Sequence, residues 1–180
     1  MKWTTRQNMV EEVAPGKVCA EIGVWRGDFS RVILATNPKE LHLIDYWGKQ
    51  DGEYSRDPTN NENLEEAYQI VYEEFSLDSR VSVIRKLSSD AVGGYDNGFF
   101  DVVYIDANHT WTGITVDIFA WWEKVKSGGY LCGHDYTKAD PSYDWIEVAA
   151  VVDAWARIKG LLVHSTEDYS VGASWAILKP

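Results

Sequence analysis

The sequence predicts an α/β fold, a Rossmann-like doubly wound sheet of mostly parallel strands with helices on both faces. Short apolar runs alternate with segments whose apolar residues recur every three or four positions. The runs are nearly continuous rather than alternating, which is typical of strands buried on both faces. With 180 residues, 45% of them hydrophobic, the chain suits one domain over residues 1–180 with its own core.

The strands are predicted from seven apolar runs. In chain order they are Val18–Val24, Leu41–Asp45, Arg80–Arg85, Asp101–Asp106, Tyr130–Gly133, Leu161–Ser165 and Gly172–Leu178. The segment between the last two, Thr166–Val171, is too short for a parallel crossover. We therefore expect these two strands to form an antiparallel hairpin at one edge of the sheet.

The helices are predicted from apolar stripes with helical spacing. Three stripes run over Leu64–Phe75, Ile114–Val125 and Trp145–Trp155. Ser127–Gly129 is expected to stop the second helix, in which Trp121 and Trp122 are core residues and Asp117 is solvated. A further helix is expected to follow Gly27, with Asp28 as its N-cap.

Composition excludes several classes of protein. The 17 basic and 28 acidic residues give a net charge of −11, which argues against nucleic acid or an anionic membrane as the partner. No apolar run is long enough to span a bilayer, and the N-terminus lacks the apolar core of a signal peptide. Cys19 and Cys132 lie in apolar runs and are predicted to be buried thiols. We expect a cytoplasmic protein, and the number of tryptophans leaves a homo-oligomer open.

Polar residues follow each of the first five predicted strands. They are Glu21–Gly27, Asp45–Trp47, Ser88–Asp90, Asp106–His109 and Gly133–Tyr136. In open α/β sheets the carboxyl ends of parallel strands meet at one edge, and ligands bind there. The sequence therefore predicts a binding site at this edge.

The first turn indicates a cationic ligand. It has the pattern E-x-G-x-x-x-G and not the dinucleotide fingerprint G-x-G-x-x-G. Carboxylates at Glu21 and Asp28 would repel a pyrophosphate placed on the helix that follows. S-adenosylmethionine fits better, because it carries a sulfonium and an ammonium against a single carboxylate.

Each part of this cofactor has candidate partners. Gly23 and Gly27 let the backbone approach the methionine moiety, and Asp45 can accept hydrogen bonds from the ribose hydroxyls. Tyr46 or Trp47 is expected against the adenine ring, and Ser88, Ser89 or Asp90 at its edge. The expected cofactor-binding set is Glu21, Gly23, Val24, Trp25, Gly27, Ser30, Asp45, Tyr46, Trp47, Ser88, Ser89, Asp90 and Asp106.

Four segments carry a resemblance to a known family. They are CAEIGVWRGDFS, LHLIDYWG, FFDVVYIDANHTW and VKSGGYLCGHDY, which extend from Cys19 to Tyr136. Together they resemble the class I S-adenosylmethionine-dependent methyltransferases, and the last two are most similar to the small-molecule O-methyltransferases that include the macrocin O-methyltransferases. The resemblance implies strand order 3-2-1-4-5-7-6 with strand seven antiparallel. It also implies methyl transfer to a small molecule at a hydroxyl oxygen.

The resemblance also implies a catalytic centre. Metal-dependent members hold Mg²⁺ at the ends of strands four and five, which places the ligands here at Asp106, His134 and Asp135. Relatives usually have an acid at the position of His134, and imidazole suits softer divalent metals better than Mg²⁺. His109 lies three residues after Asp106, where catechol-type relatives have a catalytic lysine. His109 and His134 are therefore both candidate bases, with an ordinary pKa near ~6.5.

Two alternatives stay open from the sequence. One is a binding protein that keeps the cofactor pocket without turnover. The other, a nicotinamide-dependent oxidoreductase, is disfavoured by Glu21 and by the absence of the third glycine of the dinucleotide fingerprint. In an enzyme of this size, the irregular segments Trp47–Asn61 and Tyr136–Asp144 are expected to cover the acceptor.

Overall fold

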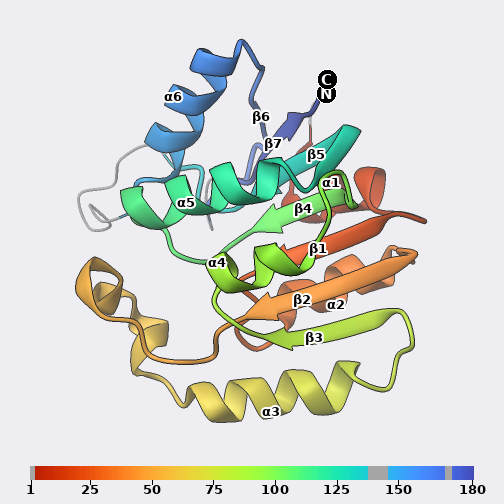
Figure 1. The fold of residues 1–180 in the computed structure, drawn as a ribbon, viewed down its shortest axis with the longest axis vertical. Helices are drawn as coiled ribbons and strands as arrows, with labels where there is room; N and C mark the ends of the chain where they lie inside the picture. Colours follow the sequence, from red (N-terminus) through yellow and green to blue (C-terminus); the bar gives the residue numbers. More distant parts are fainter. Residues whose placement is uncertain (1–2, 138–145, 169–171) are drawn as a thin grey trace.

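The computed structural model describes residues 3–137, 146–168 and 172–180, and these form a seven-stranded sheet in the order β3-β2-β1-β4-β5-β7-β6 (Figure 1). The strands are β1 Val18–Ile22, β2 Glu40–Asp45, β3 Val81–Arg85, β4 Phe100–Ile105, β5 Val125–Gly133, β6 His164–Ser165 and β7 Trp175–Leu178. Strands β1 to β5 pair in parallel, and β7 is antiparallel to both β5 and β6. The predicted fold class, strand order and edge hairpin are confirmed.

Helices cover the two faces of the sheet in two groups. They are α1 Arg6–Val13, α2 Asp28–Ala35, α3 Leu64–Phe75, α4 Ser88–Ala91, α5 Trp111–Trp122 and α6 Val148–Lys159. Apolar side chains of α1, α2 and α3 form one core cluster, and those of α4, α5 and α6 form the other. The predicted burial of Trp121, Trp122, Cys19 and Cys132 is confirmed. Among the described residues, no helix is long and apolar enough to cross a membrane.

The boundary between α5 and β5 differs from the prediction. The helix ends at Trp122, and Val125 is the first residue of β5 instead of the last residue of a helical stripe. Val125 is fully buried, so its apolar side chain satisfied the helical pattern and the strand pattern equally. Ser127–Gly129 lies inside β5, where the register with β4 shifts. A Cβ on Gly129 would lie 2.5 Å from the Asp101 carbonyl oxygen, so this glycine serves strand packing and not helix termination.

The start of α2 and the N-terminal region also differ from prediction. Gly27 is the N-cap of α2 with a left-handed φ of 78°, and Asp28 is the first helical residue. Because a glycine occupies the cap, the Asp28 carboxylate is free to pair with Arg31 at 2.7 Å. Helix α1 was not predicted, since it buries only Met9, Val10 and Val13. Trp145 of the third predicted stripe lies outside the described residues, and α6 begins at Val148.

Gly23 joins the ends of three strands. Its backbone N–H donates to the Ile44 carbonyl of β2 at 2.9 Å, and the Asp106 N–H donates to the Ile22 carbonyl of β1 at 2.7 Å. Gly23 has a φ of +87°, and a Cβ there would overlap the carbonyl group of Asp106. The turns after β1 and β4 therefore approach each other as closely as a glycine permits.

We predict that Gly23→Ala lowers the free energy of unfolding by about 3 kcal/mol, because it adds a backbone clash to a left-handed conformation. Urea unfolding measures the change. Gly16→Ala is the matched control, since Gly16 has a φ of +70° and a Cβ there would meet no atom within 4 Å. The control should lose about 1 kcal/mol of unfolding free energy, because only its left-handed backbone conformation disfavours alanine. Equal losses in the two variants would contradict the close approach.

Candidate functional site

A cavity of about 630 Å³ opens at the carboxyl ends of the parallel strands. The predicted cofactor residues that line it are Glu21, Gly23, Val24, Trp25, Asp45, Tyr46, Trp47, Ser88, Ser89 and Asp106. Gly27, Ser30 and Asp90 do not line it. Gly27 packs against Phe75, Ser30 lies behind Glu21, and Asp90 borders a shallow depression next to Tyr46. The strand-end rule, by which ligands bind at the carboxyl ends of parallel strands, therefore places most of the predicted cofactor residues around one cavity.

Glu21 is a buried acid on the wall of this cavity. It is 1% exposed and accepts a hydrogen bond from the Ser30 hydroxyl. Burial raises the pKa of Glu21 to about 8, against the lowering effect of the Ser30 hydrogen bond. A cationic group beside Glu21 would favour its charged form, so the position suits an ammonium ligand.

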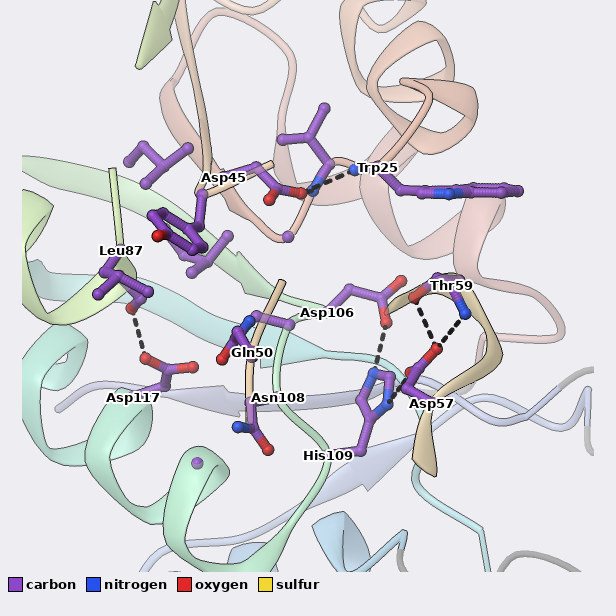
Figure 2. A pocket seen from close by; sticks show the side chains of 18 of the residues that line it. Trp25, Asp45, Gln50, Asp57, Thr59, Leu87, Asp106, Asn108, His109 and Asp117 are labelled. Atoms are coloured by element: carbon purple, nitrogen blue, oxygen red, sulfur yellow. Dashed lines mark hydrogen bonds and ion pairs between the residues drawn. The ribbon is translucent and has the colours of Figure 1, made fainter. Parts of the chain in front are cut away.

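Asp45 organises the turn after β1. Its Oδ2 accepts the backbone N–H groups of Val24 at 2.8 Å and Trp25 at 2.9 Å, and its Oδ1 accepts that of Trp47 at 2.9 Å. Figure 2 shows the Asp45 carboxylate facing Trp25 across the cavity wall. Trp47 is buried, with its Nε1 donating to the Trp25 carbonyl at 2.7 Å, whereas Tyr46 is 41% exposed. Of the two aromatic candidates for adenine stacking, Tyr46 is thus the accessible one.

Acids and histidines gather at the ends of β4 and β5. His109 Nε2 lies 3.0 Å from Asp135 and 3.5 Å from Asp106, and its Nδ1 lies 3.6 Å from Asp57. His134 Nδ1 lies 3.3 Å from Asp135 and 3.8 Å from Asp106. Figure 2 shows the His109 ring between Asp106 and Asp57. The structure therefore brings together every residue that was predicted for the metal or the base.

The acids around His109 determine its charge. Burial opposes a charge on the ring, but contacts with Asp106 and Asp57 and the charge of Asp135 outweigh burial and raise the pKa of His109 to about 10. The pKa of His134 is also raised, by Asp135 and Asp106 against burial. In this state His109 carries a proton at neutral pH and acts as a counter-ion to the carboxylates.

Three of these side chains form a candidate metal-ligand set. One ligand atom from each of Asp106, His134 and Asp135 lies within 4.8 Å of the other two. His134 directs Nδ1 at both carboxylates, while no described residue hydrogen-bonds its buried Nε2. Two carboxylates and an imidazole suit a divalent ion such as Mn²⁺ or Zn²⁺, so the donor set fits a metal.

Three cavity residues were missed by the sequence prediction or assigned to solvent. Arg6 of α1 lies 3.9 Å from Asp106 and over the Phe29 ring. Asp57, from the segment after β2, is 5% exposed and accepts two hydrogen bonds from Thr59. Asp117 was expected to be solvated, but it is 4% exposed and lines the cavity, because it lies on the inner side of α5.

Comparison with known proteins matches this arrangement to one family. The sequence profile of a family described as a methyltransferase domain matches residues 20–136, from β1 to the segment after β5. The matched region contains Glu21, Asp45, Asp106 and the two candidate bases. No curated protein sequence shows significant similarity to this chain.

Solved structures show the same fold at low sequence identity. An O-methyltransferase family protein from Burkholderia thailandensis is 16% identical over 96% of this chain and 55% of its own, with a TM-score of 0.67. An O-methyltransferase from Bacillus cereus in complex with SAH is 15% identical over 96% of this chain and 78% of its own, with a TM-score of 0.66. A spermidine synthase from Thermotoga maritima is 16% identical over 98% of this chain and 58% of its own, with a TM-score of 0.59.

The structural neighbours thus include more than one kind of enzyme, and at these identities they support the fold alone. The similarity to macrocin O-methyltransferases in particular stays a prediction. The profile match covers well over half of the chain. The protein therefore belongs to the methyltransferase-domain family, and this membership supports S-adenosylmethionine as its cofactor.

Proposed function

We propose that the protein transfers a methyl group from S-adenosylmethionine to a hydroxyl oxygen of a small-molecule acceptor, with a divalent metal ion at Asp106, His134 and Asp135. The observation that carries the proposal is the position of Asp106, which belongs to this ligand set and also lines the cavity that holds Glu21 and Asp45. His109, which contacts both Asp106 and Asp135, lines the same cavity. The Bacillus O-methyltransferase that contains SAH has the same fold, which is consistent with oxygen as the target.

S-adenosylmethionine would be bound by the charge of Glu21 and by the turn after β1. The Glu21 carboxylate would accept a hydrogen bond from the ammonium of the methionine moiety, and Gly23 permits close approach of the backbone. Asp45 has one more acceptor position beyond its three backbone hydrogen bonds, which is enough for one ribose hydroxyl. Because the turn is already held by Asp45, the donor meets a preformed site.

The reaction is an in-line displacement. The acceptor oxygen forms a bond to the methyl carbon while the carbon–sulfur bond breaks, and S-adenosylhomocysteine leaves with the electron pair. A divalent ion held by Asp106, His134 and Asp135 would lower the pKa of an acceptor hydroxyl. The hydroxyl proton passes to His109, because His134 would be a metal ligand. Contacts with Asp106 and Asp57 and the charge of Asp135 raise the pKa of His109, so His109 would accept the proton when a bound cation neutralises Asp106 and Asp135.

We predict that affinity for S-adenosylhomocysteine rises with pH by up to about tenfold per unit below pH 8. The pKa of Glu21 is about 8 in the free protein, and the ligand's ammonium lowers it, so binding below pH 8 releases a proton. Calorimetry at pH 6, 7 and 8, in two buffers of different ionisation enthalpy, measures both effects. Glu21→Gln should flatten the slope, and Asp28→Asn should keep it. A slope retained in Glu21→Gln would exclude Glu21 as the group responsible.

We predict that the chain binds one Mn²⁺ or Zn²⁺ more tightly than Mg²⁺, because one ligand is an imidazole. Calorimetric titration with each metal gives the affinity and stoichiometry. Asp106→Asn and Asp135→Asn should each weaken binding by about tenfold or more. Glu73→Gln on the exposed side of α3 should not change it. Equal affinity in all variants would remove the metal from the proposal.

The reaction itself is tested with isotopically labelled S-adenosylmethionine and a panel of phenols and alcohols, each paired with the matching amine. Label should transfer to the hydroxyl compounds, and chelation by EDTA should abolish the transfer. Methylation of amines alone would contradict oxygen as the target, and full activity in EDTA would contradict metal assistance. Undiminished turnover of His109→Gln would eliminate it as the base. Tight cofactor binding without any product would instead favour a binding protein.

A further inference from the structure

Asp117 is a buried acid that the proposed reaction does not use. It lies on α5, is 4% exposed, and belongs to the wall of the cofactor cavity. Within the part of the chain that the structure describes, its carboxylate accepts one hydrogen bond, from the Ser88 hydroxyl to Oδ1. Ser88 in turn accepts from Trp121 Nε1 at 2.7 Å. A buried carboxylate is costly unless hydrogen bonds satisfy it, and a ligand in the cavity can supply a further hydrogen-bond donor to Asp117.

The orientation of Asp117 points to a ligand as that donor. Figure 2 shows one carboxylate oxygen on the dashed line to the start of α4, and the other turned away from it toward the open space of the cavity. The bond to Ser88 and the packing of Trp121 hold the side chain in this direction. Burial raises the pKa of Asp117 to about 6, so the group is ionised and accepts hydrogen bonds above that pH.

The surroundings of Asp117 suit a flat, weakly polar ring. Leu87 and Val116 also line the cavity, and they are 37% and 46% exposed despite their apolar side chains. A planar base placed between α4 and α5 would cover this apolar surface, at a gain roughly proportional to the area removed from water. The carboxylate at its edge would then recognise a donor group on the ring.

The order of groups along the cavity identifies which part of the cofactor lies here. In Figure 2 Asp117 and the Asp106–His109–Asp57 group lie on opposite sides of the view, and Asp45 lies above both. The methyl donor carries the base and the methyl sulfonium at opposite ends of its ribose, so its two ends would reach the two sides while the ribose meets Asp45. If the reacting end is beside His109, the base is beside Asp117.

We propose that Asp117 accepts a hydrogen bond from the 6-amino group of adenine and so selects adenine over bases that lack this donor. This assignment rests on the proposed use of S-adenosylmethionine. It is separate from the strand-end residues Ser88, Ser89 and Asp90, which were the expected partners of the adenine edge. Asp117 instead comes from the helix that follows β4.

The test compares S-adenosylhomocysteine with S-inosylhomocysteine, in which an oxygen replaces the amino group. Calorimetry at pH 8 measures both affinities, with Asp117 ionised. The wild-type protein should bind the adenine compound about tenfold to a hundredfold more tightly, because a carboxylate faces either a donor or a repelling oxygen. Asp117→Asn should reduce this ratio by at least about tenfold, because the amide can donate to the 6-oxygen.

Asp51→Asn is the matched control, since Asp51 is another acid of the same cavity wall and its loss should leave the ratio unchanged. An unchanged ratio in Asp117→Asn would overturn the proposal, because a purely structural role would weaken both ligands equally. If that variant fails to fold, equal affinity of the wild-type protein for the two ligands would also overturn it. If the wild-type protein binds neither ligand, the proposed function itself fails.

Discussion

The close approach of the Gly23 backbone to Asp106 is the constraint on which the site depends. It joins the end of β1, which carries Glu21, to the end of β4, which is followed by Asp106 of the candidate metal set. Hydrogen bonds to Ile22 and Ile44 hold the two turns at this separation. The proposed methyl transfer needs donor and acceptor in line and nearly in contact, so the backbone contact that ties the sheet together would also set the geometry of that reaction.

The acids around the cavity favour cationic ligands. The cavity collects acids that bulk solvent does not fully screen, and burial raises the pKa values of Glu21 and Asp117. Near Asp106 the same excess of negative charge holds a proton on His109. A cationic methyl donor and a divalent metal would each relieve part of this charge, so each would stabilise the folded site. The local charge balance therefore supports the cationic cofactor predicted from the first turn.

The fold was predictable because local sequence patterns determine its strands and helices. Parts of the site were not predictable, because no local pattern marks their residues. Continuous apolar runs gave the buried strands, and the short final connection gave the antiparallel edge, both confirmed. The predicted boundary between α5 and β5 was wrong because Val125 fits the helical pattern and the strand pattern of apolar residues equally. The strand-end rule found Glu21, Asp45 and Asp106, which sit where the rule applies. Arg6 and Asp57 come from elements outside that rule, and no local pattern places them beside the cavity.

Asp117 is different, because the sequence did contain a signal for it. In the stripe of α5, Ile114 lies three residues before Asp117 and Trp121 four residues after it. Residues at those spacings share one face of a helix, so an aspartate between them must face the core side and not solvent. An acid on an apolar stripe is rarely kept there without a partner. The position of Asp117 on the apolar stripe therefore indicated the cavity wall, whereas its polarity alone indicated solvent.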